Sequence, residues 1–362
     1  MRVYCYPADL TGCGEYRMLM PARFLRAQGH DIVIKPPSER EGLGGFIDDA
    51  TGRLVDVTVP GDADVIVLQR LTLSMMAEAV PLIRAKGVAV VVDMDDDLSS
   101  IHPRHTAFEK YQPGSGGKHS WANAEEACRH ATMVTTSTAA LQKVYAPHGR
   151  GAVLPNRIPA RYLDIPRVDS DVIGWAGSVH SHPDDLKEMG TAVRRLVSQG
   201  HRFRVVGPPY GVTKELDLDA MPEATGNVDF DDWPEAVASL GIGVAPLQDS
   251  IFNRSKSDLK VKEYAAAGVP WVASPRVEYA AFHKEGAGLL ASKPQHWFQH
   301  LRRLATDASL RAELSEAGRA VAARHTVEEH AWRWLEVWQD AYRMERQAAA
   351  ARRGTVGVVR VA

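Results

Sequence analysis

The sequence has few of the features that mark secreted, membrane-spanning or nucleic-acid-binding proteins. Three cysteines in 362 residues, Cys5, Cys13 and Cys128, are too few for a disulfide framework and fit a reducing compartment. No apolar run approaches the length of about 20 residues that spans a bilayer, and no signal peptide precedes the strand-like segment 2–6. The net charge of -2 gives no general attraction for nucleic acid. We therefore expect a cytoplasmic protein without a membrane span.

The length and the order of predicted elements indicate two α/β domains. At roughly 100–200 residues per domain, the chain is long enough for two. Strand-like and helix-like segments alternate in each half, which is typical of doubly wound parallel sheets, and the proline-containing segment 155–166 interrupts the alternation. The expected parts are a first domain (1–156), a linker (157–170), a second domain (171–325), a final helix packing back toward the first domain (326–345) and a flexible tail (346–362).

The segment 253–274 has the clearest functional pattern. It contains a predicted helix, 257–267, that follows a strand, and the amino end of a helix attracts anions such as phosphate. Lys256, Lys260 and Lys262 crowd this end, although lysine is favoured at the opposite end of a helix. Lysines placed against this preference favour a bound anion at the amino end of the helix. A capped surface helix with solvated lysines is the other interpretation.

The run Lys-Val-Lys-Glu-Tyr-Ala-Ala-Ala-Gly-Val-Pro-Trp-Val-Ala-Ser, residues 260–274, resembles the donor-site signature of the family 4 group of retaining GT-B glycosyltransferases. The resemblance implies that Glu263 binds the ribose of a nucleotide sugar and that the turn Ser257, Asp258 and Leu259 holds its diphosphate. Lys260 is implied as a further phosphate contact and is also a catalytic candidate. Ser255 stands where the family has a first glutamate, so the divergent Lys-x-x-Glu-Tyr branch fits better. The implied fold is GT-B, two Rossmann-like domains facing across a cleft.

A second segment, 173–186, joins a strand to a predicted helix, 184–199, through a loop of small residues. Glycine at position 177 would let a ligand approach the backbone, and the helix start would add a second anion site. The resemblance extends to this loop and implies donor contacts for Gly177, Ser178 and His182, the last of which is also a catalytic candidate.

Two segments of the first half complete the candidate site. Gly12, Gly14 and Arg17 lie in and after a predicted loop, 9–14, between the first strand and helix, where a phosphate or the acceptor could bind, or where a tight turn simply needs glycine. Asp93, Asp95 and Asp96 lie at the carboxyl end of the apolar strand 88–93, on the ligand side of a parallel sheet. The resemblance implies that they are candidate catalytic residues near the transferred sugar. Capping and solvated charge are the alternative. We expect no bound metal and no cofactor.

The resemblance implies transfer of a sugar from a nucleoside diphosphate to a hydroxyl, with retention of configuration at the anomeric carbon. The acceptor stays open among glycan, lipid, protein and modified nucleic acid, because fold does not set function. The oligomeric state is open too. Two alternatives use the same architecture: a sugar-nucleotide epimerase, with His180, His182 and Asp95 as acids and bases, and a non-catalytic nucleotide-sugar-binding protein. The incomplete glycine fingerprint disfavours an NAD-dependent dehydrogenase.

Overall fold

The structure, a computed structural model, describes residues 1–37, 42–112 and 120–355 and divides into two compact units. Unit 1 contains the described residues up to 99, from 109 to 155 and from 330 onward; unit 2 contains residues 100–108 and 156–329. The division at 155/156 lies next to the linker that the sequence predicts. The segment 100–108 belongs to unit 2, not to the first domain as predicted: Thr106 N donates to the carbonyl of His180 at 3.0 Å.

Unit 1 is built on a six-stranded parallel sheet in the order β2-β1-β5-β6-β7-β8. Its strands are β1 (Val3–Tyr6), β2 (Ile32–Ile34), β5 (Val65–Gln69), β6 (Ala89–Met94), β7 (Met133–Thr136) and β8 (Gly151–Val153). Because the chain adds β2 on one side of β1 and β5 on the other, the strand order reverses between β1 and β5. Connections diverge at such a switch point and leave a crevice at the carboxyl ends of the strands.

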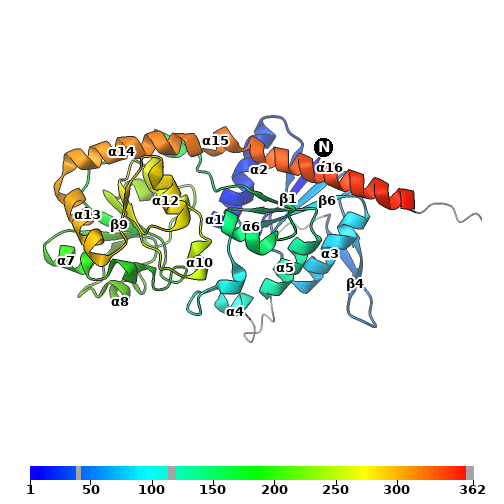
Figure 1. Cartoon of the computed structure of the whole chain (residues 1–362), viewed down its shortest axis with the longest axis horizontal. Helices are drawn as coiled ribbons and strands as arrows, with labels where there is room; N and C mark the ends of the chain where they lie inside the picture. The colour runs from blue at the N-terminus through cyan, green and yellow to red at the C-terminus, as the bar shows by residue number, and fades with distance from the viewer. Residues whose placement is uncertain (38–41, 113–119, 356–362) are drawn as a thin grey trace, which may run out of the picture. The chain divides into compact units, whose positions relative to one another are not determined.

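Helices cover both faces of this sheet, with α2 and α16 on one face and α3, α5 and α6 on the other (Figure 1). The helical segments are α1 (Gly12–Gly14), the π-helical turn η1 (Glu15–Leu19), α2 (Met20–Ala27), α3 (Ser74–Ala85), η2 (Leu98–Ser100), α4 (Phe108–Tyr111), α5 (Ser120–His130), α6 (Ala139–Tyr145) and α16 (Trp332–Thr355). Covering on both faces explains why β1, β5 and β6 are buried along their whole length.

Three features of unit 1 differ from the sequence prediction. An antiparallel hairpin, β3 (Gly44–Ile47) and β4 (Leu54–Thr58), has no counterpart among the predicted elements. The predicted loop 9–14 already contains α1, because Asp9 Oδ1 accepts hydrogen bonds from Thr11 and from the Gly14 N–H at 3.0 Å. Helix α16 runs to Thr355, so residues 346–355 are helical where we predicted a flexible tail; 356–362 lie outside the described residues. Among the described helices, none is long and apolar enough to cross a bilayer.

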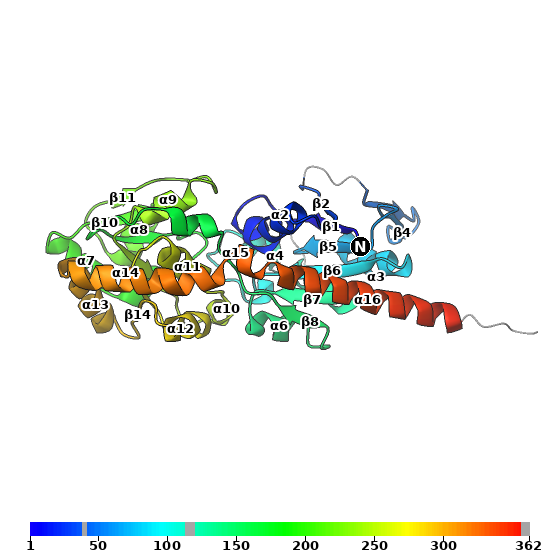
Figure 2. The same ribbon diagram turned by 90° about the horizontal axis from the view of Figure 1, so that it is seen from above.

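Unit 2 repeats the architecture with a second six-stranded parallel sheet, in the order β11-β10-β9-β12-β13-β14. Figure 2 labels β10, β11 and β14 of this sheet. The strands are β9 (Ile173–Ala176), β10 (Phe203–Val206), β11 (Glu223–Ala224), β12 (Ile242–Ala245), β13 (Trp271–Ala273) and β14 (Leu289–Leu290). Here the order reverses between β9 and β12. Alternate residues of each strand face opposite cores: Ile242 and Val244 lie in one cluster and Ala245 in the other.

The helical segments of unit 2 are η3 (Ala160–Asp164), η4 (Asp185–Met189), α7 (Ala192–Ser198), α8 (Val212–Leu216), α9 (Trp233–Ala238), α10 (Ile251–Arg254), α11 (Leu259–Ala266), α12 (Val277–Lys284), α13 (Pro294–Thr306), α14 (Ala308–Ala322), η5 (Ala323–His325) and α15 (Val327–His330). The single helix predicted over 184–199 is wrong. The chain forms the 3₁₀ turn η4, reverses at Gly190, where φ is +56°, and only then begins α7. The second helix amino end, which we predicted as an anion site, is therefore absent from this described segment.

Helix α11 is attached to the middle of the unit 2 sheet by one buried hydroxyl. Tyr264 Oη accepts a hydrogen bond from the Ala176 N–H at 2.8 Å, at the end of β9. It donates to the carbonyl of Val244 in β12 at 3.1 Å. A residue larger than glycine at position 243 would collide with the Tyr264 ring, since an added Cβ would lie 2.8 Å from it. The ring and hydroxyl together fix α11 over the switch point between β9 and β12.

Tyr264→Phe is expected to lower the free energy of unfolding by about 1–3 kcal/mol, because it leaves a buried N–H and a buried carbonyl without their partner. Chemical denaturation of the full chain measures the loss. Tyr210→Phe is the control, since Tyr210 is 65% exposed in the same unit, and it should change little. Equal effects of the two substitutions would contradict the anchoring role of Tyr264.

Candidate functional site

The amino end of α11 lies at the carboxyl edge of the unit 2 sheet. The first N–H groups of an α-helix have no partner within the helix, and they carry a partial positive charge. Residues 256–260, which form this end, are half-buried rather than covered. The position that the sequence assigns to a phosphate therefore exists as a partly accessible helix end beside the switch point.

Lys260 connects this helix end to the loop after β9. Its ammonium group donates to the carbonyl of Ala176 and lies 5.7 Å from the centre of the Trp175 ring. A methyl group added to Gly177 would lie 3.2 Å from Lys260 Nζ. The structure thus brings together two segments, 173–178 and 257–263, that the sequence singled out separately.

Burial lowers the pKa of Lys260 below the ordinary lysine value, although the nearby carboxylates of Glu263 and Asp185 act in the opposite direction. The shift means that the surroundings do not fully repay the loss of water around the ammonium group. An anion bound beside Lys260 would supply the missing charge.

Gly177 and Gly207 fix the shape of the loop. The two residues follow β9 and β10, and a Cβ added to Gly207 would lie 2.4 Å from the carbonyl oxygen of Gly177. Gly207 also has φ of +127°, in the region that favours glycine. Ser178, next in the loop, accepts a hydrogen bond from the N–H of His180 at 3.3 Å. Gly207 was not predicted; its position directly after a buried strand was the available signal.

His182 lies beside the same loop with a fixed ring orientation. Its Nδ1 is 3.0 Å from Oδ2 of Asp185, and its ring meets the Trp175 ring edge-on at 6.1 Å between centres. Burial lowers the pKa of His182, and the charge of Lys260 acts in the same direction, so the imidazole is neutral near pH 7. Because an ionised carboxylate only accepts, Nδ1 carries the proton and Nε2 is the acceptor.

Asp185 is the buried centre of this region, at 1% exposure. Besides His182, its carboxylate accepts hydrogen bonds from Asn253 Nδ2 at 2.6 Å and from the N–H of Gln248 at 2.9 Å. These donors come from the segment that leads from β12 to α11. Asp185 therefore ties the ends of β9 and β12 together, a role the sequence analysis missed because the partners lie 63 and 68 residues away.

Glu263 is less accessible than the sequence predicts. It is 5% exposed, and its Oε1 accepts hydrogen bonds from Trp233 Nε1 at 3.0 Å and from Tyr162 Oη at 3.2 Å. Both donors belong to unit 2. The sequence resemblance places Trp233 where similar enzymes contact the base, whereas Tyr162 was not predicted. A ribose diol would have to replace the indole donor of half-buried Trp233 or add to it.

Two of the predicted phosphate contacts have protein partners. Asn156 Nδ2 donates to Ser257 Oγ at 2.9 Å, and Lys262 Nζ lies 2.7 Å from Asp258 Oδ1. Lys262 also donates to the carbonyl of Asn156 at 3.0 Å and is 1% exposed. Lys262 is therefore a structural cation, contrary to the interpretation that all three lysines face an anion. The backbone of Ser257, Asp258 and Leu259 remains the candidate contact.

The unit 1 candidates separate into buried and accessible groups. Arg17 and Asp93 form a buried ion pair, 2.7 Å between Arg17 Nη2 and Asp93 Oδ2, and Arg17 also donates to the carbonyl of Leu154. Their side chains are 1% and 3% exposed, which corrects their assignment as acceptor-side or catalytic groups: they hold β6 and β8 in place.

Gly12 and Gly14 lie in α1, where a Cβ on Gly14 would lie 1.9 Å from the carbonyl oxygen of Asp9. Glycine at position 14 is thus required by backbone packing.

Asp95 and Asp96 are half-buried at the carboxyl end of β6 and share one cation. Arg70 Nη2 lies 2.8 Å from Asp95 Oδ2 and 2.9 Å from Asp96 Oδ2. Arg70, which directly follows the neighbouring strand β5, was not predicted. The two carboxylates therefore stay candidates, as one ion-paired group rather than as separate acids.

Comparison with known proteins agrees with this architecture. A sequence model for a family described as "Glycosyl transferase-like" matches residues 187–336, most of which lie in unit 2. Among solved structures, HepE from Anabaena in complex with UDP is similar over 94% of this chain and 100% of the HepE chain, at 12% identity and a TM-score of 0.61. The chain has the GT-B fold. No curated protein matches the sequence.

Two further structures share the fold. The catalytic domain of starch synthase IV from Arabidopsis thaliana, bound to ADP and acarbose, is similar over 95% of this chain and 99% of its own, with 11% identity and a TM-score of 0.63. Sucrose-phosphate synthase from Thermosynechococcus elongatus is similar over 95% and 100%, with 12% identity and a TM-score of 0.61. At these identities the likeness concerns the fold of the chain.

Gly207→Ala should disturb the Gly177 loop, because the added methyl would overlap the Gly177 carbonyl oxygen. Gly200→Ala is the matched control: φ is +92° there, but nothing lies within 4 Å of the added Cβ. Both substitutions carry the backbone cost of a positive φ, about 1–2 kcal/mol, and Gly207→Ala should cost more. Thermal unfolding measures the difference, and equal midpoints would contradict the close approach.

Lys260→Met tests the desolvated ammonium. The pKa of Lys260 is lower in the folded protein than in the unfolded chain. At pH values between these two pKa values the unfolded chain binds more protons, so Lys260 makes the free energy of unfolding rise with pH. The free energy of unfolding of wild type relative to Lys260→Met should therefore increase from about pH 7 to about pH 10. Lys284→Met, at an exposed lysine of the same unit, should show no such increase. A constant difference between wild type and Lys260→Met over this range would contradict the burial argument.

Proposed function

We propose that this protein is a glycosyltransferase that moves a sugar from a nucleoside diphosphate to a hydroxyl acceptor. The observation that carries the proposal is the meeting of Lys260, at the amino end of α11, with the Gly177 loop at the end of β9. A helix end, a desolvated cation and a loop that only glycine can form suit a diphosphate. The GT-B fold and the glycosyl transferase-like segment 187–336 support the same function.

The reaction transfers charge to the leaving diphosphate. The bond between the anomeric carbon and the phosphate oxygen breaks, and the electron pair leaves with the phosphate. The acceptor oxygen bonds to the anomeric carbon, and its proton passes to the departing phosphate oxygen. We assign stabilisation of the developing charge to Lys260 and to the N–H groups at the start of α11, which are in place before the reaction begins.

Glu263 and His182 have separate roles in this proposal. Glu263, oriented by Tyr162 and Trp233, accepts hydrogen bonds from the ribose diol. The neutral His182, held by Asp185, presents Nε2 as an acceptor for a sugar hydroxyl. Because Glu263 is 5% exposed, the diol either replaces the Trp233 indole as a donor to this carboxylate or adds to it.

The finer parts of the proposal come from the sequence resemblance. We propose retention at the anomeric carbon, a hexosyl or related donor, and chemistry that needs neither a metal nor a cofactor. We keep the cytoplasm as the proposed compartment, on the sparse cysteines. Activity that survives a chelator would support metal independence.

Glu263→Gln separates a ligand contact from a structural one. A thermal-shift panel of UDP, GDP, ADP and dTDP sugars should show one nucleotide that raises the midpoint of wild type, since a ligand of the folded state stabilises it. Glu263→Gln should lose most of that increase, because an amide accepts hydrogen bonds more weakly than a carboxylate.

Glu235→Gln, at an exposed glutamate of unit 2, is the matched control and should keep the full increase. If Glu263 only holds Tyr162 and Trp233, Glu263→Gln will lower the midpoint without ligand but leave the nucleotide-induced increase unchanged. That outcome would remove Glu263 from the binding site.

The sugar nucleotide found in this panel also distinguishes the transferase from an epimerase, which could use His182 as a base. Incubation of the bound sugar nucleotide without an acceptor should return it unchanged or slowly hydrolysed. A new sugar nucleotide would favour the epimerase.

A further inference from the structure

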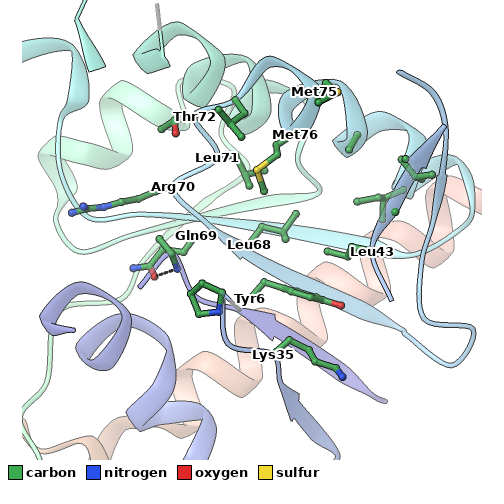
Figure 3. Close-up of a pocket in the computed structure, with 18 of the residues that line it drawn as sticks. Tyr6, Lys35, Leu43, Leu68, Gln69, Arg70, Leu71, Thr72, Met75 and Met76 are labelled. Atoms are coloured by element: carbon green, nitrogen blue, oxygen red, sulfur yellow. Dashed lines mark hydrogen bonds between the residues drawn. The ribbon is translucent and has the colours of Figure 1, made fainter. Parts of the chain in front are cut away.

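Unit 1 contains an apolar pocket at its own switch point. The cavity has a volume of about 450 Å³ and opens where β1 and β5 end, between α3 and the β3–β4 hairpin. Figure 3 shows Leu68, Leu71 and Met76 grouped on one side of it and the Tyr6 ring on the other. A volume of this size falls within the range of about 300–1,000 Å³ that holds small molecules.

Most of the side chains that line the pocket are apolar, and exposed apolar side chains border its mouth; Lys35, Thr58, Thr72 and Lys110 also line it. Leu68 and Leu71 are buried at the end of β5, whereas Leu73 and Met75, before and in α3, are 54% and 46% exposed. Of the fourteen large hydrophobic side chains that are exposed among the described residues, three line this cavity: Ile47, Leu73 and Met75. Single exposed hydrophobic residues are ordinary, but a group around a cavity marks a binding surface.

The polar groups at the inner end of the pocket already have partners. Gln69 Oε1 accepts from the Ala8 N–H at 3.0 Å, and its Nε2 donates to the carbonyl of Cys13 at 3.1 Å. Arg70 is paired with Asp95 and Asp96. A free sugar in this pocket would lose water from many hydroxyls against a mostly apolar wall, which is costly. An aromatic or aliphatic group would lose little.

We propose that this pocket binds the apolar part of the acceptor, so that the acceptor is an amphipathic small molecule carrying one reactive hydroxyl. The inference rests on the proposed transferase function and names the substrate class of its acceptor. The apolar part lies against Leu68, Leu71 and Met76. The hydroxyl lies at the end formed by Arg70, whose ion pairs link the pocket to Asp95 and Asp96.

The probe for this site is 2-naphthol, an aromatic alcohol whose fluorescence reports its environment. Wild type should bind it saturably, and Met76→Trp, which fills the cavity from α3, should weaken binding at least tenfold. Val55→Trp is the matched control, because Val55 lies on β4 but does not line this cavity. If Met76→Trp does not fold, as judged by its thermal midpoint, Ala79→Phe fills the same cavity.

Transfer is measured with the sugar nucleotide that stabilises wild type. 2-Naphthol should accept the sugar, and Met76→Trp should raise its KM at least tenfold without changing stabilisation by the nucleotide. Non-saturable binding, or equal binding by Met76→Trp and Val55→Trp, overturns the inference. If nucleotides stabilise the protein but 2-naphthol neither binds nor accepts sugar, the pocket proposal fails while the transferase stands. If 2-naphthol binds in a Met76-dependent way and no nucleotide stabilises the protein, the transferase fails while the pocket remains a binding site.

Discussion

The reversal of strand order in each sheet is the constraint on which both candidate sites depend. Between β9 and β12, and between β1 and β5, the chain departs in opposite directions from neighbouring strands, so the carboxyl ends of these strands are left without a covering connection. In unit 2 this position holds the Gly177 loop and the amino end of α11. In unit 1 it holds the apolar pocket. The same topology thus produces a polar site in one unit and an apolar one in the other, according to the side chains that follow the strands.

The two lysines of α11 show how the structure distinguishes a supporting charge from an available one. Lys262 is 1% exposed, but Asp258 and the Asn156 carbonyl satisfy it from within the fold. Burial lowers the pKa of both lysines, so the pKa does not distinguish them. Lys260 is half-buried, and its ammonium group donates to the backbone carbonyl of Ala176. The differences in exposure and in partners therefore favour Lys260 as the group that meets an anion.

Much of the fold followed from short-range patterns, because alternating apolar strands and helices with glycine stops leave little choice but parallel sheets. The proximity of the 173–178 loop and α11 was also predictable from the sequence, since the loop follows one strand and the helix begins after another at the same edge of one sheet. The hydrogen-bond and ion-pair partners of the site residues were not predictable. Tyr162 lies 101 residues from Glu263, and Arg17 lies 76 residues from Asp93. No local pattern encodes such contacts, so buried charges were predicted as accessible ones.

Backbone strain gives an independent indication of where function lies. Among the residues that the structure describes, three that are not glycine have positive φ: Arg70, Asp184 and Asp217. Such conformations cost of order 1–3 kcal/mol and persist where the surroundings hold them, which is often at binding sites. Arg70, with φ of +50°, follows β5 at the pocket and is held by Asp95 and Asp96. Asp184, with φ of +69°, precedes buried Asp185 and pairs with Arg104. Two of the three strained residues, Arg70 and Asp184, therefore lie beside the two switch points. At these positions the shape of a ligand site, rather than the stability of the sheet, gives a reason to retain the strained conformations.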